Sequence, residues 1–571
     1  MRQLLRQIYG QKEGDSAYHR ILSIIGSAPE KRQDGKPHFS QKDIFLITYG
    51  DSLQSLKETP LKTLHRFADQ FLKGVFSTIH FLPFFPYSSD DGFSVIDFFS
   101  INPDLGTWQD VRDFHPDFGL MFDYVVNHIS AQSPWFKKYL GGKKSYETLA
   151  IEMDPSTDLS QVTRPRSLPL LTEFKKQTGD RVHLWTTFSA DQVDLNFASI
   201  DVLEKMIKVL LFYVAQGATV LRLDAVAYLW KAVGTACIHL SQTHDMVRLF
   251  RKVLDRVAPE VMLITETNVP HPENISYFGD GTNEAQMVYN FTLPPLLLYT
   301  FAKSDATALS RWAQGLEVPS NKNTFFNFTA SHDGIGVRPL EGILPKNEVD
   351  ELILIVEQNG GSVSYKHNPD GTRSPYELNI TYIDALLDPK EEKDPLHINR
   401  ILVSQAIQYA LPGVPATYIH SLLGSRNWQE GVQQTGQPRS INREKLNLDQ
   451  LETELEDPGS FRSKVFFPYL EMIKTRKKQP AFHPKSPFEI MPINPKIFAI
   501  IRSCREQTIY ALNNISPEWV SISLSLRHLP ENMKDLISGQ MISIDSFQMM
   551  PYEVLWLEDK AESRYGRIDP T

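Results

Sequence analysis

Acidic side chains recur at the ends of short apolar runs in this 571-residue sequence. Asp224 ends the run TVLRLD, Glu266 follows LIT, and Asp333 follows NFTASH. Three such carboxylates suit glycosyl transfer, in which one is the nucleophile, a second donates the proton, and a third can hydrogen-bond sugar hydroxyls as the ring distorts. A single aspartate at a strand end is more often a helix N-cap or a turn residue, so the prediction rests on the recurrence.

Neighbouring residues suggest how two of these carboxyls differ. Arg222 lies two positions before Asp224, hence on the same face of a strand, and we expect its charge to favour the ionised carboxylate. The apolar stretch before Glu266 is expected to raise the pKa of that carboxyl and keep it protonated as an acid. The sequence thus predicts one nucleophile and one proton donor.

Two histidine-containing pairs stand at the ends of other apolar runs, namely Asn127-His128 and His332-Asp333. Metal binding is an alternative for both pairs, but no third ligand recurs at a fixed short spacing. His128 taken alone is more often a hydrogen-bonded structural histidine. Their position at strand ends is therefore the only reason to assign both pairs to the predicted catalytic site.

The elements that must position these groups are eight short runs rich in β-branched and aromatic residues. Helical patterns lie between them, for example at 202–217 and 244–257. This alternation predicts an α/β fold with a parallel sheet, and eight β-α units close a (β/α)8 TIM barrel whose chemistry lies at the C-terminal strand ends. The eight predicted strands are 43–51, 77–85, 119–128, 218–226, 261–268, 287–293, 324–333 and 413–421.

Spacing and composition divide the chain further. Long stretches after the third and seventh strands are predicted to be inserted subdomains on the site face. Beyond about residue 480 the helical pattern fades into short strands and turns. The expected domains are an N-terminal helical extension (1–42), a catalytic barrel (43–480) with insertions at about 130–185 (B) and 335–400 (B'), and a C-terminal β domain (481–571).

Charge and cysteine content exclude several classes of protein. The net charge is −9 and the pI is near 6.0, which disfavours nonspecific nucleic-acid binding. No window of 18 consecutive apolar residues is present, so we expect no membrane partner. Cys237 and Cys504 form neither a disulfide framework nor a zinc cluster, which favours a reducing, cytoplasmic location.

Longer motifs resemble a known family. DYVVNH, LRLDAV, TETN and SHDG, in that order and spacing, resemble the α-amylase family of glycoside hydrolases (family 13). LITYGDS, LRLDAVAYLWKAVGTACI, LPPLLLYTF, SHDGIGV and SINRE resemble its sucrose phosphorylase branch, over about residues 43–445. The NPDGTRSPYELN loop and the TRPRSLPLLT insert are most similar to the glucosylglycerate phosphorylases of that branch.

The resemblance implies residue roles. Asp224 is expected to be the nucleophile, Glu266 the general acid/base, and Asp333 the transition-state stabiliser. Asp91 is expected to be a turn residue only. The implied glucose-site residues are Asp90, Phe93, His128, Arg222, His332 and Arg439, and those lining the site entrance are Phe188, Gln192 and Tyr228. The implied or candidate phosphate and acceptor contacts are Arg166, Lys366, His367 and Arg373.

The implied activity is that of a hexosyltransferase acting as a retaining glycoside phosphorylase on 2-O-α-glucosylglycerate. It uses inorganic phosphate as co-substrate, with no cofactor and no metal, and a homodimer is possible. Cations that bind phosphate also suit the carboxylate of glycerate. Asn268 and Ala227 depart from the sucrose-specific pattern. The alternatives are a glucosylglycerol phosphorylase, a sucrose or sucrose 6'-phosphate phosphorylase, an α-glucosidase-type hydrolase, and a non-catalytic barrel serving as a scaffold.

Overall fold

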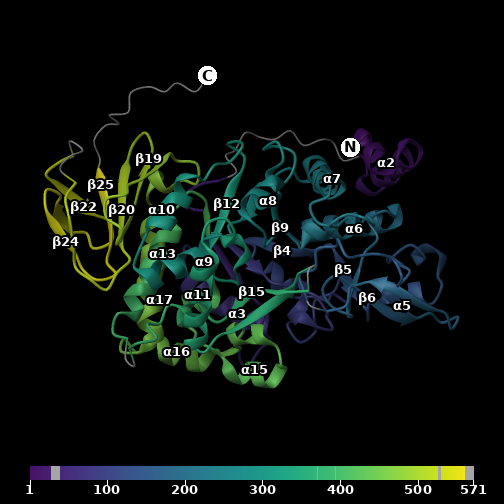
Figure 1. Cartoon of the computed structure of the whole chain (residues 1–571), viewed down its shortest axis with the longest axis horizontal. Helices are drawn as coiled ribbons and strands as arrows, with labels where there is room; N and C mark the ends of the chain where they lie inside the picture. Colours follow the sequence, from purple (N-terminus) through teal and green to yellow (C-terminus); the bar gives the residue numbers. More distant parts are fainter. Residues whose placement is uncertain (27–38, 167, 369–370, 392–393, 525–528, 560–571) are drawn as a thin grey trace.

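Eight parallel strands close into a barrel in the computed structural model, which describes residues 1–26, 39–166, 168–368, 371–391, 394–524 and 529–559 (Figure 1). Each of the eight predicted runs contains one of these strands. The fold class is therefore confirmed. In chain order they are β1 (Phe45–Thr48), β3 (Thr78–Phe81), β4 (Gly119–Val125), β9 (Ala218–Asp224), β10 (Met262–Thr265), β11 (Met287–Tyr289), β12 (Thr324–Phe328) and β16 (Val414–Tyr418).

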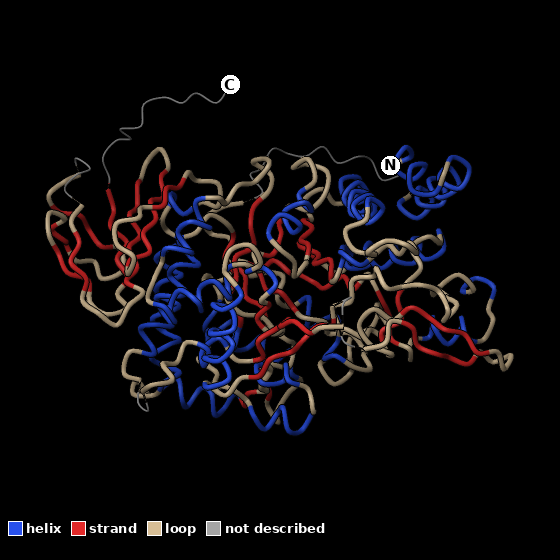
Figure 2. The backbone as a smooth tube through the Cα atoms, viewed as in Figure 1, coloured by secondary structure: helices blue, strands red, loops and turns tan. Residues whose placement is uncertain are grey.

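The barrel strands are largely buried on both faces because side chains fill the inside and helices cover the outside. Every residue of β1, β12 and β16 is buried. Inside the barrel, the rings of Phe45 and Phe326 meet edge to face with centroids 5.3 Å apart. Figure 2 shows the helices around the red strands. The main ones are α3 (Pro60–Phe67), α6 (Ile200–Ala215), α7 (Ser241–Val257), α9 (Leu293–Lys303), α13 (His397–Ala410) and α17 (Phe461–Lys477).

Two inserted segments rise above the C-terminal ends of the strands. Between β4 and β9 lie β5 (His128–Ser130), α5 (Pro134–Leu140), β6 (Leu171–Lys175), β7 (Arg181–Trp185) and β8 (Gln192–Asp194). Between β12 and β16 lie β13 (Ile335–Gly336), α11 (Lys346–Gln358), β14 (Ser362–His367) and β15 (Arg373–Asn379). β5 pairs with β8, and β15 pairs with both β13 and β14, so each insert is tied back to the strand end from which it leaves.

Both chain ends add separate layers. The helices α1 (Arg2–Tyr9) and α2 (Gln11–Ile25) pack on α6 and α7, and the Tyr9 hydroxyl donates to the Phe197 carbonyl at 2.8 Å. The last part of the chain forms an antiparallel sheet of β18 (Phe488–Ile490), β19 (Ile497–Ser503), β20 (Thr508–Asn514), β25 (Val554–Asp559), β22 (Asn532–Asp535) and β23 (Met541–Ser543). We propose domain boundaries at 42/43 and 480/481, between these layers and the barrel.

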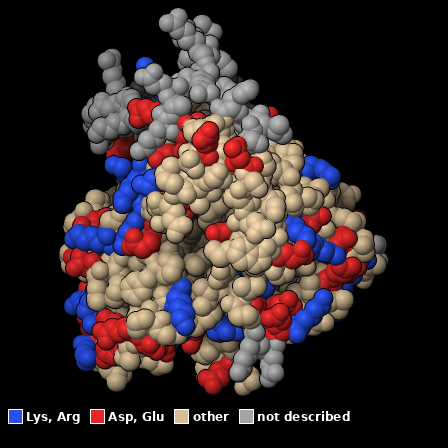
Figure 3. Space-filling view, turned by 90° about the vertical axis from the view of Figure 1, so that its left-hand side faces the viewer, with Lys and Arg blue, Asp and Glu red and all other residues tan. Residues whose placement is uncertain are grey.

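The surface of the C-terminal side carries both signs of charge. Acidic and basic side chains are interspersed there, and neither forms one continuous field (Figure 3). None of the described helices combines the length and the apolar character needed to cross a lipid bilayer.

Candidate active site

A pocket opens at the C-terminal ends of the barrel strands, under the two inserts. It is lined by most of the residues that the sequence predicted for the site: Asp90, Phe93, His128, Arg166, Phe188, Gln192, Asp224, Tyr228, Glu266, His332, Asp333 and Arg439. These side chains lie at the C-terminal ends of six barrel strands, or in the segments that follow them, and closure of the barrel brings those strand ends together.

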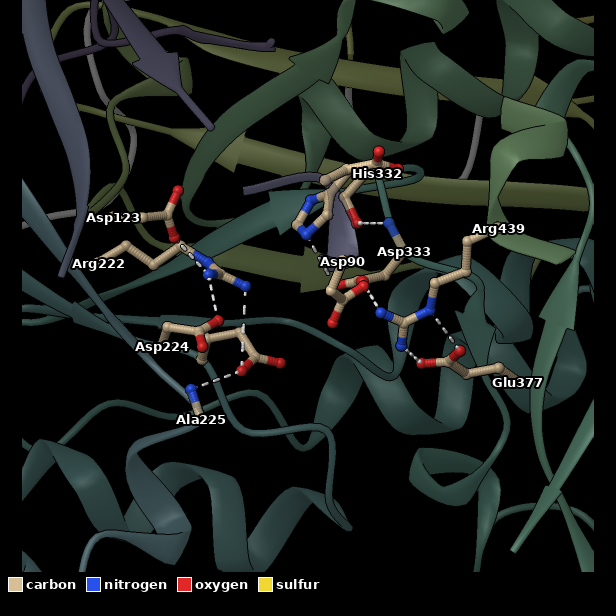
Figure 4. Close-up of polar contacts among 12 residues, drawn as sticks. Asp90, Asp123, Arg222, Asp224, Ala225, His332, Asp333, Glu377 and Arg439 are labelled. Atoms are coloured by element: carbon tan, nitrogen blue, oxygen red, sulfur yellow. Dashed lines mark hydrogen bonds and ion pairs between the residues drawn. The ribbon is translucent and has the colours of Figure 1, made fainter. Parts of the chain in front are cut away.

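Arg222 lies beneath the pocket and links its acids to the barrel interior. The guanidinium is 2% exposed, and its Nη1 donates to Asp224 Oδ1 at 2.7 Å and to Asp123 Oδ1 (Figure 4). Asp123 is fully buried, and its other carboxylate oxygen contacts Nε2 of His80 at 2.8 Å. The Asp224 side chain is therefore held by a chain of buried polar contacts that runs through Arg222 and Asp123 to His80, across the neighbouring strands β9, β4 and β3.

Asp224 and Glu266 share this arginine. Glu266 Oε2 accepts a hydrogen bond from the Ala225 backbone N–H at 3.1 Å and lies 3.9 Å from Arg222 Nη2. Ala225 adopts a left-handed conformation with φ 49°, which is unusual for a residue with a Cβ and turns its N–H toward Glu266. The two carboxyls are thus neighbours on one guanidinium.

Burial raises the pKa of both carboxyls, although Arg222 opposes the shift in each. The Glu266 charge raises the Asp224 pKa further, and the Asp333 charge does the same for Glu266. The upward direction agrees with the expectation for Glu266, whereas for Asp224 burial outweighs the arginine that was expected to keep it ionised. Arg222 hydrogen-bonds Asp224 directly, whereas its nearest approach to Glu266 is 3.9 Å and is no hydrogen bond. We therefore expect a proton held by the pair to be on Glu266.

Asp333 has the opposite electrostatics. Its Oδ1 lies 2.6 Å from Arg439 Nη1, and Arg439 binds Glu377 with two further hydrogen bonds of 3.0 and 2.5 Å (Figure 4). Burial acts to raise the pKa of Asp333, but Arg439, His332 and Arg443 together hold it well below its usual range. Asp333 is therefore an anion beside a clamped arginine.

The Asp90 turn is strained and anchored. Asp90 and Asp91 have φ values of 54° and 47°, two consecutive left-handed residues that are not glycine. Sequence analysis assigned Asp91 to a turn and nothing more. Its Oδ2 in fact accepts from the buried Arg443 Nη1 at 2.5 Å, and the same arginine donates to the His332 carbonyl at 2.8 Å. That prediction was incomplete because the partner lies 352 residues away in the chain.

Aromatic rings line the pocket walls. The Phe93 ring stacks on His332 with centroids 4.7 Å apart and planes 6° apart, and Phe188 meets Tyr228 edge to face at 5.5 Å. His128 contacts the Phe93 carbonyl through Nε2 at 2.9 Å. Flat apolar walls of this kind suit the faces of a sugar ring.

The predicted phosphate and acceptor cations are placed less uniformly. Arg166 lines the pocket, with Nη2 4.0 Å from Asp90 Oδ2. Lys366 and Arg373 lie on the β14–β15 hairpin and are not among the lining residues, and Arg373 is exposed. The side chain of His367 lies outside what the structure describes. Their roles stay predictions. From the same hairpin, Tyr376 and Glu377 line the pocket instead.

Sequence reasoning missed several residues that organise the site. Asp123 stands inside the motif DYVVNH, Glu377 inside SPYELN, and Arg443 four positions after Arg439 in RSINR. Each of these is a charged residue within an apolar or motif-bearing stretch. Because a charged residue is buried only with a partner, this pattern could have indicated a buried ion pair.

Asn127, one half of the possible metal pair, has another partner. The Lys231 ammonium donates to Asn127 Oδ1 at 2.7 Å and lies 2.5 Å from Asp194 Oδ2, and this lysine is 4% exposed. Within the described part of the chain, no three His, Cys, Asp or Glu side chains lie together as a metal-ligand group.

Comparisons with known proteins agree with this geometry. Residues 70–334 match the α-amylase catalytic domain model. The chain is 45% identical to a glucosylglycerate phosphorylase of Escherichia coli, over 97% of this chain and 99% of that protein, and 46% identical to one of Spirochaeta thermophila, over 98% of each. The crystal structure of a sucrose 6F-phosphate phosphorylase from Thermoanaerobacter thermosaccharolyticum superposes with a TM-score of 0.73 at 27% identity, covering 83% of this chain and 94% of that one.

The chain belongs to the α-amylase family of glycoside hydrolases, family 13. The near full-length similarity to phosphorylases places it in the phosphorylase branch that the sequence motifs indicated.

Proposed function

We propose that this protein is a retaining glycoside phosphorylase that cleaves 2-O-α-glucosylglycerate with phosphate to α-D-glucose 1-phosphate and glycerate. The observation that carries the proposal is 45–46% identity, over nearly the whole chain, to phosphorylases named for this substrate. A pocket that is lined by Asp224, Glu266 and Asp333 and by an arginine paired with two acids gives the proposal a chemical basis.

In the first proposed step, Asp224 attacks the anomeric carbon of the glucosyl group. The bond from that carbon to the glycerate oxygen breaks, and Glu266 gives its proton to the departing oxygen. The raised pKa of Glu266 favours the protonated form that this step needs. The product is a glucosyl-enzyme bonded through Asp224, in the inverted configuration.

In the second proposed step, a phosphate oxygen attacks the same carbon. The bond to Asp224 breaks, and Glu266, now a carboxylate, takes the phosphate proton, so both residues return to their starting state. Two inversions give net retention. A retaining enzyme needs its two carboxyls close together, about 5–5.5 Å apart, and their shared contact with Arg222 supports this.

The remaining lining residues are proposed to bind the glucosyl group and phosphate. Asp333, Asp90 and Arg439 are suited to bind the hydroxyls of the glucosyl group, and Phe93 is suited to pack against the sugar ring. Arg166 is the candidate phosphate contact within the pocket, and the β14–β15 cations are the candidate contacts for the glycerate carboxylate. The leaving group of this substrate is an anion, which suits a cationic rim.

Location and assembly remain proposals as well. Cys237 and Cys504 are both free, which supports the reducing cytoplasm expected from the sequence. The possible homodimer stays a prediction.

A donor panel tests the proposed function. Glucose 1-phosphate release is measured from glucosylglycerate, glucosylglycerol, sucrose and sucrose 6'-phosphate, each with and without phosphate. The proposal expects phosphate-dependent release with a strong preference for glucosylglycerate. Preference for another donor would keep the phosphorylase chemistry and overturn the substrate. Free glucose at the same rate without phosphate would make the protein a hydrolase.

A further inference from the structure

Three loops that supply the glucose side of the pocket meet at one carboxylate, Asp191. This residue lies in the loop between Phe188 and β8, and sequence analysis gave it no role. Its carboxylate does not line the pocket. It is therefore a residue whose contribution to binding would have to pass through its neighbours.

Serine hydroxyls converge on this carboxylate. Ser88 and Ser89 each donate to Asp191 Oδ2 at 2.5 Å, and Ser94 donates to the same oxygen at 2.7 Å. Ser130 lies 3.5 Å from Oδ1 and 2.5 Å from the Ser88 hydroxyl. Hydrogen bonds to a carboxylate are stronger than those between neutral groups, so we expect this cluster to hold the serine loops firmly.

The serines come from both loops that face Asp191. Ser88, Ser89 and Ser94 flank the Asp90 turn on either side, whereas Ser130 belongs to β5, two residues after His128. The main chain repeats the connection, because the Ala131 N–H donates to the Asp191 carbonyl at 2.8 Å. Asp191 thus joins the loop after β3 to the loop after β4.

The third loop is that of Asp191 itself. The adjacent residue, Gln192, lines the pocket, and its Nε2 reaches Asp90 Oδ2 at 3.4 Å and His128 Nε2 at 3.2 Å. A shift of the Asp191 loop would therefore move Gln192 relative to both of these groups.

The turn that these serines hold does not adopt its shape freely. Asp90 and Asp91 are left-handed, and Gly92 follows with φ 111°. A Cβ at Gly92 would lie 2.7 Å from the Pro83 carbonyl oxygen, so the turn also presses against the strand end below it. A strained conformation persists only where its surroundings over-determine it, and the serine contacts supply that restraint.

We propose that Asp191 is a positioning residue that holds the Asp90 turn in place and thereby sets how tightly the pocket binds the glucosyl group. The inference rests on the proposed function only in taking Asp90 as a glucose contact. Asp191 itself touches neither the substrate nor the reacting atoms.

The test measures binding apart from turnover. Wild type, Asp191→Asn, Asp90→Ala and the double variant are titrated calorimetrically with 1-deoxynojirimycin, an iminosugar with the hydroxyl pattern of glucose. Asp191→Asn should weaken binding about ten- to hundredfold, the value of one or two charge-assisted hydrogen bonds. In the Asp90→Ala background the same substitution should cost less than about twofold, because the effect passes through Asp90.

Steady-state kinetics give a second readout. For Asp191→Asn, KM for the glucosyl donor should rise by about the same factor as the loss of inhibitor binding, with kcat changed much less, since the catalytic carboxyls are untouched. A purely structural role would lower kcat and the amount of active enzyme together and leave KM unchanged. Equal costs of Asp191→Asn with and without Asp90 would overturn the inference.

Two further variants guard against misfolding. Ser89→Ala removes a single hydroxyl and should give a smaller loss in the same direction. Asp535→Asn is the matched control, because Asp535 also accepts from a serine, Ser538 Oγ at 2.6 Å, but lies in the C-terminal sheet. It should leave inhibitor binding unchanged. If wild type binds no glucose-shaped ligand, the proposed function fails; if wild type binds and Asp191→Asn binds equally well, only this inference fails.

Discussion

Two parts of the pocket differ in how fully their charges are paired. We call the buried part around Asp224, Glu266 and Asp333 the floor, and the part around Arg166 the rim. On the floor, Arg222 contacts Asp123 and Asp224, and a second arginine, Arg439, is held by Asp333 and Glu377. On the rim, Arg166 lines the pocket with its Nη2 4.0 Å from Asp90 Oδ2. In the proposed mechanism, we expect the paired floor to fix the geometry of bond cleavage and the more loosely paired Arg166 to receive the anions that change between the two steps.

The floor can be tested most severely at the nucleophile. Asp224→Asn keeps the size and the Arg222 contact but removes the attacking anion, so kcat/KM for glucosylglycerate should fall about 10⁴-fold or more. The companion variant Glu266→Gln should still react with α-glucosyl fluoride, whose leaving group needs no proton. Mass spectrometry of that reaction should find one glucosyl group on the Asp224 peptide. Label on another carboxylate would contradict the assignment.

The support of the floor is tested at Glu377. Glu377→Gln removes the charge that clamps Arg439 and should lower kcat/KM for the glucosyl donor about ten- to hundredfold, mostly through KM. Glu341→Gln is the control, because that carboxylate is 57% exposed and lies 3.8 Å from its arginine. Equal kinetics of the two variants would mean that the Arg439 clamp has no part in binding.

The rim is tested at Arg166. Arg166→Gln should raise the KM for phosphate about tenfold, while slow hydrolysis of the donor without phosphate stays near the wild-type rate. Arg181→Gln, on the β6–β7 hairpin and 72% exposed, is the matched loss of one positive charge. If hydrolysis fell as much as phosphorolysis, Arg166 would act in bond cleavage and not specifically in phosphate binding.

The smallest effect concerns protons. Burial lowers the pKa of His332 on the floor to about 3, and burial does the same for His420, away from the pocket lining. Unfolded histidine has a pKa near 6.5, so below that pH the unfolded chain binds protons that the folded protein does not, and stability falls. Urea unfolding should show about 1 kcal/mol lost per buried histidine between pH 6 and pH 5. His420→Gln should reduce that slope, and an unchanged slope would contradict the assignment.

The barrel and its strand-end residues were predictable because both follow from local pattern. Apolar runs that alternate with helical segments specify the strands, and parallel strands bring their ends to one face, so Asp224, Glu266 and Asp333 could be grouped without a structure. Arg439 and Asp90 needed family resemblance in addition.

What could not be predicted depends on which distant residues face each other. Asp91 binds Arg443 across 352 positions, and Asp191 accepts hydrogen bonds from serines that lie 97 to 103 positions away in the chain. Neither spacing has a sequence signature. The hairpin was expected to present Arg373 to the pocket, whereas Tyr376 and Glu377 line it. Glu377 lies at the end of β15 that pairs with β13, which closely follows Asp333 in the chain, and Arg373 lies at the opposite end of the strand. Which end of β15 lies over the site depends on this pairing, which no local pattern specifies.

The most direct test of the central claim is the anomeric configuration of the sugar phosphate as it forms. Glucosylglycerate and phosphate are mixed with the enzyme in an NMR tube, and the first product signals are assigned. Double displacement through Asp224 predicts α-D-glucose 1-phosphate and free glycerate in equal amounts. The β-anomer as the first product, or glucose without consumption of phosphate, would contradict the account.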